Sequence, residues 1–382
     1  MPLAGDVAQF NNVGGAALTY SMTHGLNPTP NQANVGAVHL LSTRVGLDLS
    51  IDSNSASASS FYYHGATVNG IDYTILANDS AKNLTLKSSG GGAAKVGLSD
   101  NVDSVVQVNG SGNISILLPI TGNNSRLVIQ STGSGQAILS GVNSTYSGGT
   151  RINSGTLVLS ANNAAGTGAI TNSGGTLTVQ SGLVLQNQII LSSALAQYKR
   201  QFASAENYNV YAVSSTLQTQ TSASLLAGVA SEAREVATSF QSSSSASNDS
   251  SRRSDVWNLS GTATDIQVVQ LSITSGLAEG SFLGWLDDST WVNATEGNSA
   301  TGSLALFGLN QSFASSGISA TADYLGSWGY DTETGSVWAV LDHGGSFAVI
   351  PEPSTLLLLG ISFTVLIIRL RWSVGPQAAR RI

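Results

Sequence analysis

The sequence predicts an all-β fold, in which an irregular β-solenoid is followed by a small β-sandwich-like domain and a single C-terminal hydrophobic helix. Three observations predict it: short β-branched runs alternate with Gly, Asn and Ser turns over residues 1–200, one strand phrase recurs after 20 residues, and all six Trp lie beyond residue 256. Short strands with regular turn signals indicate β architecture, and a fixed period indicates stacked repeats. We therefore expect four segments, namely 1–200, 201–255, 256–350 and 351–382.

Composition limits the classes of function. Only 10% of the 382 residues are charged and the net charge is −7, whereas soluble domains average about 25% charged residues. Sequence-independent binding of nucleic acid needs clustered Lys and Arg against the phosphates, so we expect no nucleic-acid partner. The chain has no Cys, which excludes disulfide bonds, thiolate catalysis and Cys-ligated zinc.

The repeated strand phrase defines one rung of the solenoid. Residues 155–159 (Gly-Thr-Leu-Val-Leu) align with residues 175–179 (Gly-Thr-Leu-Thr-Val). Alternate side chains of a strand point to the same face, so Leu157 and Leu177 fall into one apolar column when the rungs stack. A single rung cannot bury its apolar face alone, and the unit therefore has to be repeated.

Residues 137–182 carry a longer pattern, with a Tyr-x-Gly-Gly-Thr corner, a Gly-Thr-Leu strand and a Gly-Thr-Gly-Ala turn. This pattern resembles an autotransporter-associated β-strand repeat, and Gly5-Asp6-Val7-Ala8-Gln9-Phe10 is similar to a phrase that often opens such proteins. The resemblance implies a right-handed parallel β-helix of a passenger-type surface protein. It assigns the repeat motif to Tyr146, Gly148, Gly149, Thr150, Gly155, Thr156 and Leu157.

The pattern changes after residue 200. The apolar spacing over residues 214–240 predicts an amphipathic helix through Leu225, Val229, Glu232 and Val236. Residues 241–255 (QSSSSASNDSSRRSD) are too polar to bury a core, so we expect a flexible linker there. The Trp residues and the alternating apolar runs then predict a small β-sandwich with an aromatic core over residues 256–350.

Near its C-terminus the chain contains an apolar run of 14 uncharged residues, from Thr355 to Ile368. At about 1.5 Å per helical residue the run covers roughly two thirds of a hydrocarbon core of about 30 Å, so it is short for a permanent anchor. A buried core helix is the alternative interpretation, but no amphipathic partner helix is visible to cover it. The expected transmembrane helix comprises Thr355, Leu356, Leu357, Leu358, Leu359, Gly360, Ile361, Ser362, Phe363, Thr364, Val365, Leu366, Ile367 and Ile368.

Four arginines follow the run, whereas Glu352 is the only charge just before it. The positive-inside rule keeps this basic stop cytoplasmic and places the first 350 residues outside; the stop comprises Arg369, Arg371, Arg380 and Arg381. The order of a PEP motif, a short apolar helix and a basic tail resembles a PEP-CTERM sorting signal. The resemblance implies recognition and processing by an exosortase, an integral-membrane protease, at Pro351, Glu352, Pro353 and Ser354.

The N-terminus lacks the leader that such a topology requires. The first 15 residues contain neither a basic n-region nor an apolar h-region, which a signal peptide needs. We therefore expect that the chain is a fragment or begins at a misplaced start codon, with the true leader upstream of Met1.

A carbohydrate-active enzyme is one alternative for a β-helix. Most glycoside hydrolases need two carboxylates about 5–10 Å apart, but no Asp or Glu occurs between Ser104 and Ala205. The carboxylates before this gap are more typical of solvated turns: Asp48, Asp52, Asp72, Asp79, Asp100 and Asp103. We therefore expect no catalytic residues.

No cofactor or metal site is expected either. The four His, at positions 24, 39, 64 and 343, show neither His-x-His nor His-x-x-x-His spacing. Asp342 and His343 suggest part of a Ser-His-Asp triad, but no Gly-x-Ser-x-Gly elbow accompanies them. The acidic residues at 287–288 and 331–333 lack the register of a calcium loop and are typical of turns.

The expected function is therefore that of an exported, surface-sorted structural or adhesive protein of the bacterial cell envelope, anchored transiently in the inner membrane and processed at its PEP motif. Its expected partners are an exosortase, the membrane, and an extracellular polysaccharide or other matrix. An ice- or glycan-binding solenoid is the second hypothesis. It would be favoured by a flat Thr array in register over at least four rungs, and Thr156, Thr176 and Thr178 are too few to decide.

Overall fold

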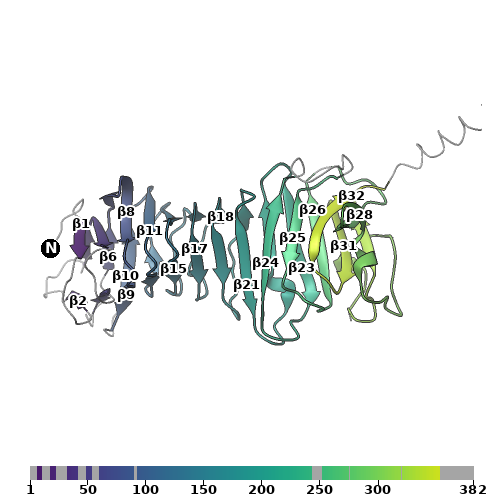
Figure 1. Cartoon of the computed structure of the whole chain (residues 1–382), viewed down its shortest axis with the longest axis horizontal. Helices are drawn as coiled ribbons and strands as arrows, with labels where there is room; N and C mark the ends of the chain where they lie inside the picture. Colours follow the sequence, from purple (N-terminus) through teal and green to yellow (C-terminus); the bar gives the residue numbers. More distant parts are fainter. Residues whose placement is uncertain are drawn as a thin grey trace, which may run out of the picture.

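The computed structural model describes residues 7–10, 18–22, 32–41, 49–53, 60–89, 93–242, 252–274, 276–319 and 321–352. These residues form an elongated body, with the N-terminal strands at one end and the C-terminal strands at the other (Figure 1). Among them the only helices are three short 3-10 turns: η1 (Tyr208–Val210), η2 (Ala294–Gly297) and η3 (Phe313–Ser315). The prediction of an all-β fold is confirmed for the described residues, which do not include the expected C-terminal helix.

The strands form three sheets, called here sheets A, B and C. In spatial order sheet A contains β1 (Val7–Phe10), β4 (Ala37–Leu40), β8 (Ile71–Asn78), β11 (Asp103–Val108), β14 (Arg126–Gln130), β16 (Thr150–Ile152), β18 (Ile170–Asn172), β20 (Ile189–Leu191), β22 (Ala212–Ser215), β23 (Thr221–Gly228), β26 (Gln267–Ile273), β31 (Ser336–Leu341), β30 (Trp328–Asp331) and β29 (Leu309–Asn310), with β7 (Ala66–Val68) paired to β8. Sheet B contains β2 (Leu18–Met22), β5 (Leu49–Ser53), β9 (Leu84–Ser88), β12 (Ile114–Ile116), β15 (Gln136–Leu139), β17 (Thr156–Leu159), β19 (Thr176–Val179), β21 (Gln197–Phe202), β24 (Arg234–Gln241), β25 (Val256–Ser260), β32 (Gly345–Ile350), β27 (Phe282–Asp287) and β28 (Thr290–Asn293). Sheet C contains β13 (Ile120–Thr121), β10 (Lys95–Leu98), β6 (Ser60–Tyr63) and β3 (Gln32–Val35).

Parallel stacking of short strands builds the first part of the rod. The expected rung is confirmed, because β17 and β19 pair in parallel with Leu157 opposite Leu177. In β12, β15 and β17 the residues Ile116, Leu139 and Leu159 lie opposite one another in successive rungs, and each is at most 1% exposed. Full burial of such a side chain stabilises the fold by about 1.5–3 kcal/mol. The columns therefore hold together strands that are individually too short to be stable.

Inward-facing Asn residues satisfy backbone groups at the corners. Asn172 is fully buried at the end of β18, and its Nδ2 donates to the carbonyl oxygens of Gly175 and Gln197 at 2.8 and 2.9 Å. Its Oδ1 accepts from the backbone amides of Gly174 and Gly175 at 3.2 and 2.9 Å. Asn78, at the end of β8 in the same sheet, also bonds to backbone groups on both sides of its amide. Buried backbone groups need such partners wherever the ladder ends.

Residues 197–241 change the sheets from parallel to antiparallel. β24 pairs antiparallel with β21, and β23 pairs antiparallel with both β22 and β26. The prediction of a helix over 214–240 is wrong, because these residues form β22, β23 and β24. Inward positions such as Ala223 and Leu225 repeat every second residue, and this strand period outweighs the four-residue spacing between Leu225 and Val229.

An aromatic cluster fills the core where this change occurs. The stacked rings of Tyr198 and Tyr211 lie 4.8 Å apart, and Phe202 meets Tyr208 edge to face at the same distance. Arg200 is 1% exposed, and its guanidinium lies 5.3 Å from the centre of the Phe202 ring. In register, Tyr198 and Arg200 of β21 take the places that Leu and Val hold in β19. Large side chains thus replace the aliphatic columns at this point of the rod.

Residues 256–350 continue the two long sheets. β25 and β32 extend sheet B beyond β24, while β26 and β31 extend sheet A beyond β23. One apolar core runs from Val35 to Val349, which differs from the expected division into a solenoid, a linker and a separate sandwich. Asp255, at the end of the expected linker, is fully buried and accepts a hydrogen bond from Ser215 Oγ at 2.7 Å. Residues 243–251 of that segment lie outside the described residues.

Replacing Asn172 by Ala is expected to lower the free energy of unfolding by about 2–4 kcal/mol, because four backbone groups at this corner each lose a hydrogen bond to its buried side chain. Urea denaturation followed by circular dichroism measures this loss. Thr171→Ala, on the outward face of the same strand, is the matched control and is expected to change the free energy by less than about 0.5 kcal/mol. Equal losses in the two variants would contradict the role of Asn172.

Candidate functional site

The repeat motif builds a corner of the rod. Tyr146 is fully buried, and its hydroxyl lies 2.6 Å from Thr150 Oγ1, which also bonds to the Ala165 carbonyl at 3.2 Å. Burial raises the pKa of the Tyr146 hydroxyl far above its ordinary value. Gly149 has a φ of +86°, and a Cβ there would lie 2.5 Å from the Ala169 carbonyl oxygen, so only glycine fits. Of the remaining motif residues, Gly148 lies at this corner, Gly155 lies in the turn between β16 and β17, and Thr156 and Leu157 lie in β17.

The PEP motif begins directly after β32, the strand that lies between β25 and β27 in sheet B. Glu352 is exposed, and a Cβ added to Gly280 would lie 2.8 Å from its carboxylate carbon. The motif therefore directly follows an interior strand of the sheet. Pro353, Ser354, the apolar run and the arginines lie outside the described residues. Within the described part, no helix has the length and apolarity needed to cross a membrane.

The carboxylates before the acid-free stretch have separate local partners. Asp72 accepts from a threonine hydroxyl at 2.6 Å, Asp100 accepts from a backbone amide at 2.8 Å, and Asp103 lies 3.6 Å from an arginine. The side chains of Asp48 and Asp52 are not among the described ones. In the parts of the chain that the structure describes, no group of three or more His, Asp or Glu side chains is arranged to hold a metal ion.

Asp79 belongs to a polar network beside β4 and β8. His39 Nε2 lies 2.7 Å from Asp79 Oδ2, Asn109 Nδ2 donates to Oδ1 at 2.9 Å, and Asn69 Nδ2 lies 3.2–3.3 Å from both oxygens. Burial raises the pKa of Asp79, but the hydrogen bonds from His39, Asn109 and Asn69 and the charge of His39 outweigh it, so the pKa lies below its ordinary value. A general acid needs a raised pKa. The lowered pKa therefore does not suit Asp79 to act as a general acid, and its three side-chain partners hold it within the network.

Asp342 and His343 do not form a triad with a serine. The two ring nitrogens of His343 each lie 2.9 Å from a backbone carbonyl oxygen, one of Gly344 and one of Ala294. Asp342 instead accepts hydrogen bonds from the backbone amide of Ser299, at 3.2 Å, and from its hydroxyl. A triad requires the carboxylate on one ring nitrogen and the nucleophile on the other. The pair therefore fastens the end of β31 to the segment around Ser299.

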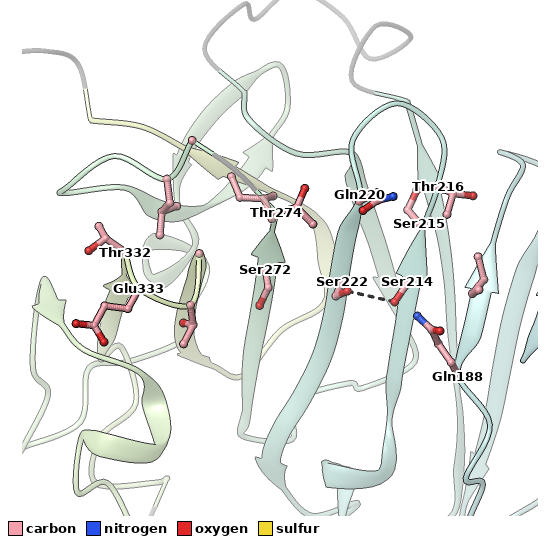
Figure 2. Close-up of a pocket in the computed structure, with 16 residues that line it drawn as sticks. Gln188, Ser214, Ser215, Thr216, Gln220, Ser222, Ser272, Thr274, Thr332 and Glu333 are labelled. Atoms are coloured by element: carbon pink, nitrogen blue, oxygen red, sulfur yellow. Dashed lines mark hydrogen bonds between the residues drawn. The ribbon is translucent and has the colours of Figure 1, made fainter.

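A polar groove of about 640 Å³ crosses the outer face of sheet A where the strands become antiparallel (Figure 2). Its floor runs across β20, β22, β23 and β26, and each strand contributes one side chain in register. Ile190 lies opposite Ser214, Ser214 opposite Ser222, and Ser222 opposite Ser272. The hydroxyls of Ser214 and Ser222 are 3.2 Å apart. Because neighbouring strands lie about 4.8 Å apart, the groove presents a regular row of hydroxyls.

Amide, hydroxyl and carboxylate groups line the ends of the groove. Figure 2 shows Gln188 and Gln220 towards one end and Thr332 and Glu333 towards the other. Among the described residues that line the groove, Glu333 is the one charged residue, and none of them is aromatic or a His. A single carboxylate cannot supply the acid/base pair of glycoside hydrolysis. The groove is suited to hydrogen-bond an extended polar chain, since hydroxyls and amides both donate and accept.

The Thr columns beside the repeat are short. Thr156 lies opposite Thr176, but the next residues in that column are Gln136 and Gln197. Thr178 faces an apolar residue of β17. The four-rung Thr array that would favour ice binding is therefore interrupted in sheet B. In sheet A, by contrast, Ser214, Ser222 and Ser272 lie in register on three neighbouring strands, and they are called here the Ser row.

Sequence reasoning missed the groove because its lining comes from residues that are far apart in the chain, from Gln188 to Gly335. Ser is abundant throughout the sequence, so no single serine stands out. The available signal was the alternation of small polar and apolar residues over 221–225 (Thr-Ser-Ala-Ser-Leu). Such alternation predicts a half-buried strand with hydroxyls on its outer face.

A comparison with protein families matches residues 132–159 to the passenger-associated-transport-repeat. The match spans β15, β17 and the Tyr146 corner between them. No curated protein and no solved structure matches this chain. The chain is thus a β-rich solenoid that contains a passenger-associated transport repeat, which indicates an exported, passenger-like protein.

Replacing Asp79 by Asn is expected to lower the free energy of unfolding near pH 7 by about 1.5–3 kcal/mol, the range for hydrogen bonds to a charged group. Because the folded-state pKa lies below the unfolded value of 3.8, the ionised form contributes stability above that value and loses it as the pH falls through the folded pKa. The difference from wild type should therefore shrink in acid, as urea denaturation over a pH series would show.

Asp72→Asn is the matched control, because the exposed Asp72 is bonded to one exposed hydroxyl. Its effect on the free energy of unfolding is expected to stay within about 1 kcal/mol across the series. A loss from Asp79→Asn that is the same at neutral and acid pH would contradict the network described for Asp79.

Proposed function

We propose that this chain is an exported structural or adhesive protein of the bacterial cell envelope. The main supporting observation is the transport repeat at 132–159, which is built into a rod whose main apolar core runs from Val35 to Val349. The rod would hold its outer faces away from the cell. Its parallel part is proposed to coil right-handed, as parallel β crossovers do in the great majority of cases.

The C-terminal sequence supports sorting by an exosortase. The exposed Glu352 follows β32 directly, and the PEP motif, apolar run and basic tail stand in the order of a sorting signal. Cleavage near Pro353 would keep every described strand, including β32, in the released body. Processing would therefore separate the membrane segment from a complete rod. The chain is proposed to be anchored transiently in the inner membrane with its tail in the cytoplasm.

A non-catalytic role agrees with the side chains of the rod. Asp72, Asp79, Asp100 and Asp103 are each engaged by a different local partner. The groove of Figure 2 contains one carboxylate. These observations favour a structural or adhesive function over that of a carbohydrate-active enzyme.

Glycan binding is the second candidate function, and the Ser row favours it. Ser214, Ser222 and Ser272 lie in register on the floor of a groove that runs across the strands. Their spacing of about 4.8 Å suits a repeating polar chain laid across the strands. An extracellular polysaccharide of the envelope matrix is the proposed partner.

The sorting proposal predicts processing near Pro353 that depends on the host. The chain is expressed behind a functional leader in an exosortase-positive strain and in the corresponding null strain, and the C-terminal mass is measured. We expect the shortened C-terminus in the positive strain alone. Identical C-terminal masses in the two strains would contradict the sorting claim.

The groove predicts a loss of glycan binding when its hydroxyls are removed. The double variant Ser222→Val and Ser272→Val is expected to bind an array glycan at least about 10-fold more weakly than wild type, because buried polar groups of the ligand lose their partners. Thr178→Val, on sheet B, is the control and should bind like wild type. An array on which wild type binds no glycan, together with no effect on ice recrystallisation, would favour a purely structural rod.

A further inference from the structure

A second groove, of about 560 Å³, lies against sheet C, away from the Ser row of sheet A. It crosses β6, β10 and β13 and reaches the turn that precedes β16. Its lining combines one aromatic ring with polar side chains on three successive rungs: Tyr62, His64, Ser99, Asp100, Thr121 and Asn123. Binding grooves for small polar ligands typically combine an apolar surface with a few placed polar groups.

The Tyr62 ring lies flat on the sheet. In β10 the residue opposite Tyr62 is Gly97, and a Cβ added there would lie 2.8, 2.8 and 2.9 Å from three successive ring atoms, Cδ1, Cε1 and Cζ. Nearly equal distances to three atoms mean that the ring face, and not its edge, covers Gly97. The absence of a side chain at Gly97 leaves room for the ring in this position, and Tyr62 also lines the groove. Tyr62 is accordingly half-buried.

Polar groups are fixed around this ring. His64 is held at both nitrogens, with Nδ1 at 3.1 Å from Ser99 Oγ and Nε2 at 3.0 Å from Asn34 Oδ1. The exposed Asp100 accepts from the backbone amide of Asn123 at 2.8 Å through Oδ1. That bond orients the carboxylate along the rim of the groove. The side chains of Asp100 and Asn123 therefore offer both acceptors and donors beside a flat apolar surface.

We infer that this groove binds a neutral or amino-sugar residue of a polysaccharide. The apolar face of a pyranose ring would stack on the outward face of Tyr62, and its hydroxyls would donate to Asp100 and bond to Asn123. The described lining residues include no Lys or Arg but do include Asp100 with its carboxylate, so the groove disfavours phosphorylated ligands and uronic acids. This inference rests on the adhesive part of the proposed function and assigns it a site distinct from the groove of Figure 2.

Titration calorimetry on the full chain tests the site, in a detergent without a sugar headgroup. The probes are short oligomers of glucose, mannose and N-acetylglucosamine, with an oligouronate and a proline-rich peptide as comparators. We expect wild type to bind at least one of the three neutral or amino-sugar oligomers. Tyr62→Ala should weaken that binding at least about 10-fold, whereas Tyr62→Phe should bind within about 2-fold of wild type, because stacking needs the ring and not the hydroxyl.

Two further variants separate a lost site from a lost fold. Gly97→Ala keeps Tyr62 but displaces its ring, and it should also weaken binding at least about 10-fold. Tyr73→Ala removes an aromatic side chain that is 53% exposed and does not line the groove, and it should bind like wild type. Each variant is accepted as folded when its circular dichroism spectrum and melting temperature match those of wild type.

The binding results distinguish between the inferred site, the ligand class and the proposed function. Undiminished binding by folded Tyr62→Ala would overturn the site and leave the adhesive function standing with the groove of Figure 2. Binding of the oligouronate or the peptide alone would overturn the ligand class. If wild type binds no saccharide, the site and the glycan-binding candidate both fail, while the exported rod is judged separately by its C-terminal processing. If Tyr62→Ala does not fold, Tyr62→Phe and Gly97→Ala decide, and equal binding by these two variants would overturn the stacking role.

Discussion

The inward side chains of each rung depend on the neighbouring rungs for their burial, and this mutual burial supports every other feature of the rod. The column through Ile116, Leu139 and Leu159 is at most 1% exposed, yet β12 and β16 are each three residues long. Isolated strands of that length are not stable. Register therefore matters more than strand length, because a shift by one residue would turn the whole apolar column outward. Gly149 and Asn172 preserve the register by closing corners that other residues would distort.

Because the inward columns carry the stability, the outward columns are free to vary. One outward column of sheet A reads Val128, Arg151, Thr171, Ile190 and Ser214 in successive strands. Apolar, cationic and hydroxyl side chains thus occupy equivalent places without changing the fold. The two proposed binding surfaces lie where neighbouring outward positions share the same chemistry, as in the Ser row, and where the absence of a side chain leaves room for a neighbouring ring, as at Gly97.

The sequence contained enough information for the parallel part of the rod and too little for its antiparallel end. The 20-residue offset and the Leu157 and Leu177 pairing follow from local patterns that repeat. The strands after residue 200 do not repeat, and Leu225 and Val229 suit a helical spacing as well as they suit a strand until their partners are known. Asp255 sits in a run of polar residues, so its burial depends on Ser215, which lies 40 residues earlier. Both grooves depend on register between strands, which composition and motifs do not encode.

The antiparallel strands also cover the open edge at which a parallel stack of strands would otherwise end. A parallel stack ends in a rung whose full edge is open to a further strand, and such an edge promotes association. Here sheet A ends in β29, which has two residues, and sheet B ends in the hairpin strand β28. The last described strand, β32, is inserted between β25 and β27 and is not left at the edge. On the outer face Trp338 is covered by Phe313, with ring centres 5.4 Å apart. The rod thus reaches its closed form only when residues up to 350 are in place, immediately before the segment proposed to hold it in the membrane.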